Sequence, residues 1–191
     1  LNTVIKNKEL PELLDTLYSI SQTGISAVII QDWGVYDLIR NHFNNLKIHA
    51  STQMGNHNSL GGTYSEKLGF ERVIFARELT QKELISVREK SNIQIEMFVH
   101  GALCYSFSGM CLFSSYLGGM SANRGMCMQP CRRMYHDENQ KKYLFSLKDY
   151  QLIKHIPEIM KLGVFSLKVE GRLKSAEYVY QVARAYRMAI D

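Results

Sequence analysis

Four cysteines gathered in one part of the chain are the residues most able to do chemistry. They are Cys104, Cys111, Cys127 and Cys131, and the rest of the chain has no other cysteine. Disulfide staples would be spread more widely, and a chain of 191 residues does not need them to bury a core. Neither pair has the Cys-x2-Cys spacing of a zinc ribbon, whereas four thiolates of varied spacing hold iron–sulfur clusters. We therefore predict one shared metal site. An iron–sulfur cluster is favoured over zinc, free thiols or a redox disulfide.

The elements that must position these thiols follow an alternation of short apolar runs and longer amphipathic segments. This alternation is typical of parallel strands joined by crossover helices. We predict strands at 1–6, 27–31, 47–51, 72–76, 93–99 and 164–169. Helices are expected at 11–21, from 32 to about 43, from 58 or 59 to 69, at 80–90, at 146–162 and from 175 to the end. Thr80 and Glu83 have the spacing of a capping box.

Six such units are too few for a closed (β/α)8 barrel, which typically needs about 250 residues. The chain also starts at Leu1, on a predicted strand and without an initiator Met. We expect residues 1–191 to form a single incomplete TIM-like barrel of about six βα units, with the first two units missing upstream. An open α/β sheet is the alternative. Residues 100–140 break the rhythm and are interpreted as a cysteine-rich insertion before the last strand.

Functional residues of a parallel barrel lie at the carboxyl ends of its strands. Polar residues at or after predicted strand ends include His49, Gln53, Arg77, His100, Glu170 and Arg172. Polar residues are partly expected at any strand end, because these ends are wetter than strand middles.

Glu96 and Lys168 are charged residues inside otherwise apolar runs. Burying such groups is costly unless they are paired. Either they form an internal ion pair, or Glu96 contacts a ligand, or both side chains reach water. Lys168, Glu170, Arg172 and Lys174 also alternate, which puts them on one face of a strand. This mostly basic row could hold a carboxylate or phosphate.

The composition is that of an ordinary globular domain, with 46% hydrophobic and 21% charged residues. The net charge of +5 permits an anionic partner such as RNA without requiring one. No stretch approaches the roughly 20 apolar residues of a membrane helix, and no signal peptide is visible. We therefore expect a cytoplasmic protein without a membrane partner.

Four stretches of the sequence resemble peptidase family U32, the collagenase-like proteins. The first is the run Glu96-x-Phe98-x2-Gly101-Ala102-Leu103-Cys104-x4-Gly109-x-Cys111. The others are HASTQMGNHNS at 49–59, SANRGMCMQPCR at 121–132 and SLKVEGRLKSAEYV at 166–179. The resemblance thus covers almost the entire chain, with Phe113 as a small departure where an aliphatic residue is expected.

The resemblance implies a barrel, and a 4Fe–4S cluster on the four cysteines. It implies one of two classes of activity. One is a protease of unassigned catalytic type. The other is oxygen-independent hydroxylation of tRNA uridine, rRNA cytidine or a ubiquinone precursor, with prephenate as the oxygen source. A non-catalytic, cluster-bearing partner subunit is a third option, since some family members work as heteromeric pairs.

The residues themselves favour the hydroxylase over the protease. The sequence has no H-E-x-x-H zinc helix and no G-x-S-x-G nucleophile elbow. In the hydroxylase, the catalytic candidates are Glu96, His100 and Glu170. The candidates for binding a small carboxylate donor or RNA are His49, Gln53, Arg124, Lys168 and Arg172. A basic stretch at Arg124, Arg132, Arg133, Lys141 and Lys142 is expected to contact an RNA backbone. Tyr105, Phe107 and Tyr135 are candidates to stack a displaced base.

Overall fold

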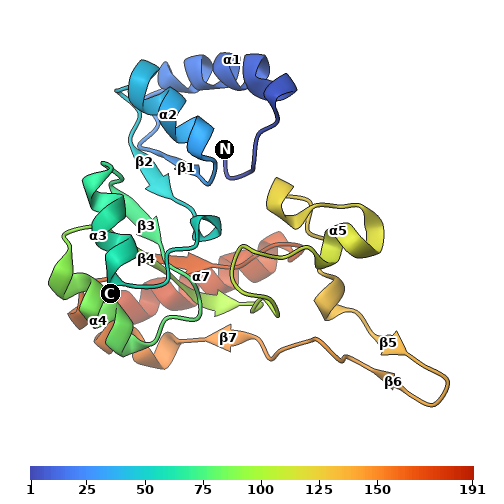
Figure 1. The fold of residues 1–191 in the computed structure, drawn as a ribbon. Coiled ribbons are helices and arrows are strands. Elements are labelled where there is room, and N and C mark those ends of the chain that lie inside the picture. The colour runs from blue at the N-terminus through green and yellow to red at the C-terminus, as the bar shows by residue number, and fades with distance from the viewer.

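A mostly parallel sheet organises residues 1–191, which are all described by a computed structural model (Figure 1). Five parallel strands lie in chain order across it: β1 (Val28–Ile30), β2 (Ile48–Ala50), β3 (Arg72–Ile74), β4 (Gln94–Gly101) and β8 (Ser166–Val169). The short strand β7 (Tyr150–Gln151) pairs antiparallel with the end of β4. Chain order is what a barrel requires, but these strands form no closed barrel, so the TIM-like barrel stays a prediction.

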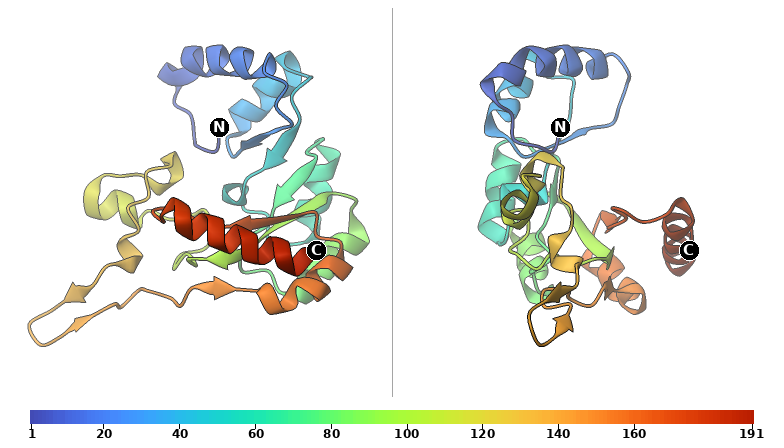
Figure 2. Two further views of the ribbon diagram at one scale, coloured as in Figure 1. Left: turned by 180° about the vertical axis from the view of Figure 1, so that it is seen from behind. Right: turned by 90° about the vertical axis from the view of Figure 1, so that its right-hand side faces the viewer.

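Six helices connect the parallel strands or flank them: α1 (Leu10–Ser21), α2 (Trp33–His42), α3 (Ser59–Lys67), α4 (Gln81–Lys90), α6 (Ile156–Leu162) and α7 (Ala176–Ile190). Local capping fixes where several of them begin. Asp32 accepts the first amides of α2, Asn58 accepts one in α3, and Thr80 forms the predicted capping box with Glu83. Figure 2 shows α1 and α2 at one end of the sheet and α7 at the other. None of the helices has both the length and the apolar character needed to cross a membrane.

Alternate strand residues divide between two environments. One set packs with the helices in the main core: Val28, Ile30, Ile48, Ala50, Val73, Phe75, Ile93 and Ile95. The other set faces the opposite side of the sheet and holds most of its polar groups: Gln31, His49, Ser51, Arg72, Gln94, Glu96 and Lys168. We call this second side the inner face.

One predicted strand is wrong, and one predicted helix starts later than expected. Residues 1–6 form no strand: the amide of Val4 bonds to the carbonyl of Asn123, and the amide of Ile5 bonds to the carboxylate of Asp32. The helix predicted at 146–162 begins only at Ile156, after a short 3-10 turn. Pro157 explains this start, because a proline fits the first turn of a helix but not its interior.

Between β4 and β7, the chain has only short elements over residues 102–149, which we call the cysteine segment. They are α5 (Phe113–Gly118), three-residue 3-10 turns at Ala122–Arg124 and Pro130–Arg132, and a hairpin of β5 (Tyr135–His136) with β6 (Lys141–Lys142). Long regular helices and strands are therefore absent from residues 102–149, as the sequence predicts. Whether residues 100–140 are an insertion stays a prediction.

Glu96 lies on the inner face and joins three strands by ion pairs. Its carboxylate is 3.0 Å from the Lys168 ammonium on β8 and 3.2 Å from the Arg72 guanidinium on β3. Burial would raise the pKa of Glu96. The positive charge of Lys168 and the hydrogen bonds from Lys168, Ser166 and Arg72 outweigh burial, so the pKa lies below its ordinary value. Of the three alternatives that the sequence leaves open, the internal ion pair with Lys168 is the one that the structure shows.

Replacing Glu96 by Gln is expected to lower the free energy of unfolding by about 2–4 kcal/mol, because two partly buried cations lose their counter-charge. A carboxylate with a lowered folded-state pKa stabilises above its unfolded pKa of about 4.3, and this contribution is lost as the pH falls through the folded value. Urea unfolding at about pH 7 and about pH 3 tests both points, with Glu158→Gln on exposed α6 as the control. A Glu96→Gln deficit of equal size at both pH values would contradict the assignment.

Candidate functional site

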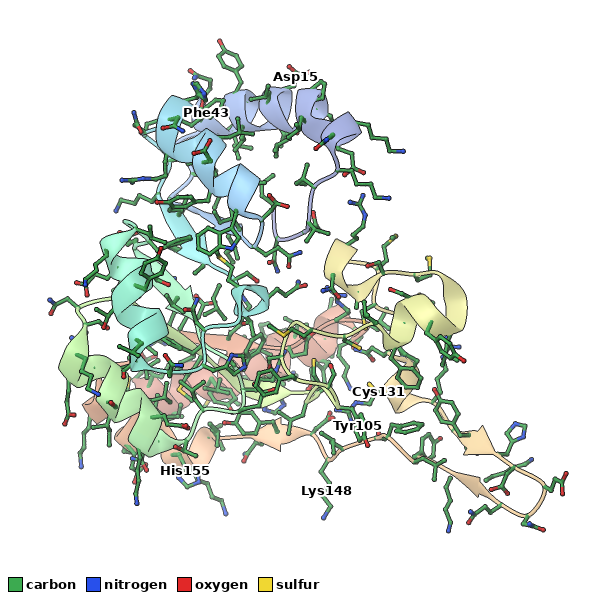
Figure 3. All side chains as sticks on the ribbon, viewed as in Figure 1. Asp15, Phe43, Tyr105, Cys131, Lys148 and His155 are labelled. Atoms are coloured by element: carbon green, nitrogen blue, oxygen red, sulfur yellow. The ribbon has the colours of Figure 1, made fainter.

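A cavity of about 600 Å³ lies between the carboxyl ends of the strands and the cysteine segment. All four cysteines line it, none of them in a disulfide. The other polar residues in its wall include Ser51, Thr52, Gln53, Arg77, Asn123, Lys168, Glu170 and Arg172. Figure 3 shows Cys131 between the body of the sheet and the β5–β6 hairpin. The cavity therefore brings together the thiols and the strand-end residues that the sequence singles out separately.

The thiols receive hydrogen bonds from their surroundings. The backbone amide of Gln129 donates to Cys127 Sγ at 3.4 Å, and Arg77 donates to Cys104 Sγ at 3.7 Å. Although Cys104 as a whole residue is exposed, burial around its sulfur raises the pKa of the thiol, while the charge of Arg77 opposes the rise. Gln129 holds a left-handed backbone conformation at φ 49°, which is strained for a non-glycine residue. Such strain is common where a backbone is positioned for a ligand.

The thiols line one cavity but are not gathered at one point. No group of three His, Cys, Asp or Glu side chains is placed to hold one metal ion. A single zinc ion needs its thiolates within about 2.3 Å of one point. A four-iron cluster, by contrast, takes one thiolate on each of four irons and so tolerates more widely separated sulfurs.

Arg77 is one of the polar strand-end residues of the sequence, but it is not among the predicted catalytic or binding candidates. Its guanidinium lies 3.5 Å from the centre of the Phe98 ring and 3.3 Å from the Glu170 carboxylate, and its side chain is 9% exposed. It therefore connects β4, β8 and Cys104 at one point. Its place directly after a strand marks it in the sequence, but its contacts with Phe98, Glu170 and Cys104 are visible only in the structure.

Predicted site residues fall into three groups. Gln53, Lys168, Glu170, Arg172 and the four cysteines line the cavity. Glu96 and His49 lie on the inner face, where Glu96 is ion-paired and His49 bonds to Glu71 at 3.3 Å. Burial lowers the pKa of His49, and the bond to Glu71, which raises it, does not fully compensate. His100 and Arg124 form a third group, because other parts of the protein engage them.

His100 points away from the cavity and packs against Tyr178 and Tyr186 of α7. Burial is the main reason that its pKa is lowered, and its Nδ1 atom is buried without a partner. Arg124 is bonded to Glu9 at 2.5 Å and to the carbonyl of Val4. This pair lowers the pKa of Glu9 to about 2.

Of the three rings predicted to stack a base, only Tyr105 lines the cavity, and it is exposed. Phe107 already stacks on His57, with ring centres 4.2 Å apart. Tyr135 lies at the base of the hairpin, where its hydroxyl donates to the carbonyl of Pro130.

Two oxygen atoms in the cavity wall lack a partner in the protein. They are Thr52 Oγ1 and Asn123 Oδ1, both buried. Buried polar atoms are nearly always hydrogen-bonded, so unpaired ones mark a place for water or a ligand. The cavity is therefore polar enough to accept a small hydrophilic molecule next to the thiols.

Side chains and a close backbone approach dock the cysteine segment on the sheet. Gln31, directly after β1, donates to the carbonyl of Asn123 at 2.9 Å, and Glu78 accepts the amide of Ser108 at 2.8 Å. At Gly109, φ is +83°, and a Cβ atom would lie 2.5 Å from the Cα of Gln53. Only glycine allows this approach, which sets the position of Cys111 two residues later.

Replacing Gly109 by Ala is expected to lower the free energy of unfolding by about 1–3 kcal/mol from the backbone conformation alone, with the clash adding to it. Gly118→Ala is the matched control, because φ there is not positive and a Cβ would meet nothing within 4 Å. Urea unfolding of both variants measures the difference. Equal stabilities would show that the segment is not packed against Gln53 as described.

The model of "Peptidase family U32" matches residues 1–191. A protein of Methanocaldococcus jannaschii named as an uncharacterized protease is 41% identical over the whole chain and 50% of its own length. The tRNA hydroxylation protein P1 of Bacillus subtilis is 33% identical over the whole chain and 48% of its own length. A 23S rRNA 5-hydroxycytidine synthase of Escherichia coli is 34% identical over the whole chain and 30% of its own length.

The fold has a solved counterpart. The structure of a U32 peptidase has a TM-score of 0.55 to this chain at 14% identity, covering 89% of this chain and 65% of that one. The chain spans half or less of the length of the curated relatives just described. With a family model that matches every residue, the chain belongs to peptidase family U32.

Proposed function

We propose that this chain carries the reaction site of an oxygen-independent hydroxylase that acts on a base of tRNA or rRNA. The observation that carries the proposal is the single cavity that holds four thiols, a strand-end carboxylate and several cations. Relatives at 33% and 34% identity are named for tRNA hydroxylation and for 5-hydroxycytidine synthesis in rRNA. An RNA substrate also fits the cytoplasmic location expected from the sequence.

In this proposal Cys104, Cys111, Cys127 and Cys131 hold a 4Fe–4S cluster. Their place around one cavity supports a shared cluster, and their spacing differs from that of a zinc ribbon. Hydrogen bonds to Cys127 and Cys104 would tune the cluster's potential. When bound, the cluster would supply iron for activating the oxygen donor and a route for electrons.

Arg172 is the cavity cation best suited to bind a small carboxylate donor such as prephenate. Lys168 and Arg77 are already paired with Glu96 and Glu170. Arg172, in contrast, has only the carbonyl of Gly125 as a side-chain partner, at 3.4 Å. A guanidinium without a carboxylate partner can take a bidentate one from a ligand.

Glu170 is placed to move a proton. Arg77 and the backbone amide of Arg172 orient its carboxylate at the cavity wall. Hydroxylation converts a base C–H to C–OH, so the base loses two electrons and a proton. The donor that gives up the oxygen takes the two electrons, and Glu170 accepts the proton.

The alternative is a collagenase-like protease, or a non-catalytic partner subunit. A thiol protease needs an imidazole beside its nucleophile. The histidine nearest in sequence to Cys104, His100, packs instead on Tyr178 and Tyr186. This contact favours the hydroxylase, because no histidine lines the cavity to act as the general base of a thiol protease.

Replacing Cys127 by Ala is expected to remove the cluster and the hydroxylated nucleoside together. Wild-type full-length protein purified without oxygen should contain about four irons per chain and absorb near 400 nm. Met126→Ala, on the neighbouring exposed residue, should keep both properties. Iron analysis and mass spectrometry of cellular RNA measure them. Hydroxylated RNA in the Cys127→Ala strain, or iron-independent cleavage of denatured collagen by the wild type, would count against the hydroxylase.

Replacing Arg172 by Met is expected to weaken donor binding by about 10–100-fold, the usual cost of losing a charge-assisted hydrogen bond. The iron content should not change, because Arg172 makes no bond to a cysteine. Arg184→Met on exposed α7 is the control for loss of one positive charge. The donor concentration that gives half-maximal hydroxylation of RNA measures the effect. An unchanged value would mean that another cation binds the donor.

A further inference from the structure

The β5–β6 hairpin projects from the body of the protein into solvent (Figure 1). It contributes no strand to the main sheet, since β5 and β6 pair only with each other. Its turn is ordered by Asp137, whose carboxylate accepts the amides of Asn139 and Gln140. These bonds lower the pKa of Asp137. The hairpin is thus a defined arm that the reaction cavity does not need for its walls.

A second cavity of about 370 Å³ lies at the base of this arm, with three aromatic rings in its wall. Phe113 and Tyr135 are nearly parallel at 13°, with ring centres 6.3 Å apart. Phe145 stands across both, at 78° to Phe113 and 90° to Tyr135. The three rings form an aromatic corner with flat faces, and a cavity of this volume is within the range that holds small ligands.

The turn and the second strand of the arm supply polar groups to the same cavity. Asp137, Gln140 and Lys142 line it, together with the apolar Leu144. Lys142 lies directly opposite Tyr135 in the hairpin, so an ammonium and a ring share one face. A ligand with a flat ring, hydrogen-bonding edges and a nearby negative charge would match the aromatic rings, the Gln140 amide and the Lys142 ammonium.

The arm carries cations that no carboxylate neutralises. Arg133, Lys141, Lys142 and Lys148 are exposed, and none of them forms an ion pair. In contrast, the neighbouring Arg132 is tied to Asp149 and to backbone carbonyls. The exposed ring of Tyr143 lies beside Lys142 in the sequence. Interleaved cations and aromatic rings are the usual surface for single-stranded nucleic acid.

The aromatic corner adjoins the reaction cavity. Phe113 and Phe145 line both cavities, and Tyr105, in the wall of the reaction cavity, packs edge-on against Phe145. A ligand in the aromatic corner would therefore be separated by one layer of rings from a ligand beside the thiols. Two neighbouring nucleotides of one strand, one of them reacting, would be expected to lie this close together.

We propose that the β5–β6 arm and its aromatic corner bind a nucleotide that flanks the target base in a single-stranded RNA segment. The inference rests on the proposed function and deepens it. The flanking base stacks on Tyr135 within the corner, and Lys141 and Lys142 contact its phosphates. The arm thus selects single-stranded RNA, while the reaction cavity acts on the neighbouring base.

The test uses the full-length protein with its cluster and a short single-stranded RNA that carries photoreactive thiouridine. Lys141→Ala with Lys142→Ala is expected to weaken binding about tenfold. It should also reduce the slope of log K against log salt by about 1.4, since each phosphate contact to single-stranded RNA contributes about 0.7. Lys154→Ala with Lys161→Ala, a pair in exposed positions at α6, is the matched control and should change neither value by as much.

The aromatic corner is tested separately by cross-linking. Wild-type protein should cross-link through the peptide that contains Tyr135. Tyr135→Phe should keep the cross-link, whereas Tyr135→Ala should lose it and weaken binding about tenfold, because stacking needs the ring and not the hydroxyl. The cluster spectrum of each variant verifies that the fold is intact.

The outcomes separate this proposal from the proposed function. RNA binding that the lysine and tyrosine variants leave unchanged, in a protein that still hydroxylates RNA, would overturn the role of the arm alone. Loss of a co-purifying protein, rather than of RNA, in the lysine variant would also overturn it. Wild-type protein that binds no RNA, in cells whose RNA keeps its hydroxylated nucleoside after Cys127→Ala, would overturn both.

Discussion

One guanidinium holds the two ends of the cysteine segment together. Arg132 donates to the carbonyl of Leu103 at 2.9 Å and also to the carbonyl of Leu147, and it is 3.5 Å from the carboxylate of Asp149. Leu103 precedes Cys104, and Arg132 follows Cys131, so the same side chain fixes the backbone beside two of the four thiols. An irregular segment cannot satisfy its carbonyls by itself, and a buried carbonyl without a partner costs as much as a lost hydrogen bond. Arg132 therefore has a structural role, and its contact with an RNA backbone stays a prediction.

Charged residues of this chain divide by location into paired and unpaired groups. On the inner face, Glu96 neutralises Arg72 and Lys168, because charges out of water are costly without a partner. At the rim of the cavity, Arg172 has no carboxylate partner. Exposed cations keep most of their hydration, so leaving them unpaired costs little. The groups free to meet an anionic ligand are thus those at the rim and on the hairpin, and the buried ion pairs serve the sheet.

Sequence patterns predict best where the cause of the structure is local. Asp32 and Thr80 begin helices because each side chain caps amides within three residues, and the spacing is legible in the sequence. A strand depends on a partner elsewhere in the chain, and residues 1–6 have the composition of a strand but bond to a loop. The position of His100 likewise depends on strand pairing that the local sequence does not show. The pairing of β4 with β8 shifts between Phe98 and His100, and an irregularity of this kind re-aims the side chains that follow. Strict alternation would put His100 on the inner face with Glu96, but the shift leaves it against α7.

The clustering of the four cysteines is legible in the sequence, whereas the contacts of Arg77 and the aromatic corner are visible only in three dimensions. The parts of the candidate site also depend on different structural elements. Cys104 and Cys131 depend on Arg132, the candidate donor site depends on the end of β8, and the arm depends on its own turn at Asp137. Because the arm shares only Phe113, Phe145 and the adjoining Tyr105 with the reaction cavity, changes at its tip leave the thiols undisturbed. Under the proposed function, the RNA segment that the arm binds could therefore change while the residues around the thiols stay the same.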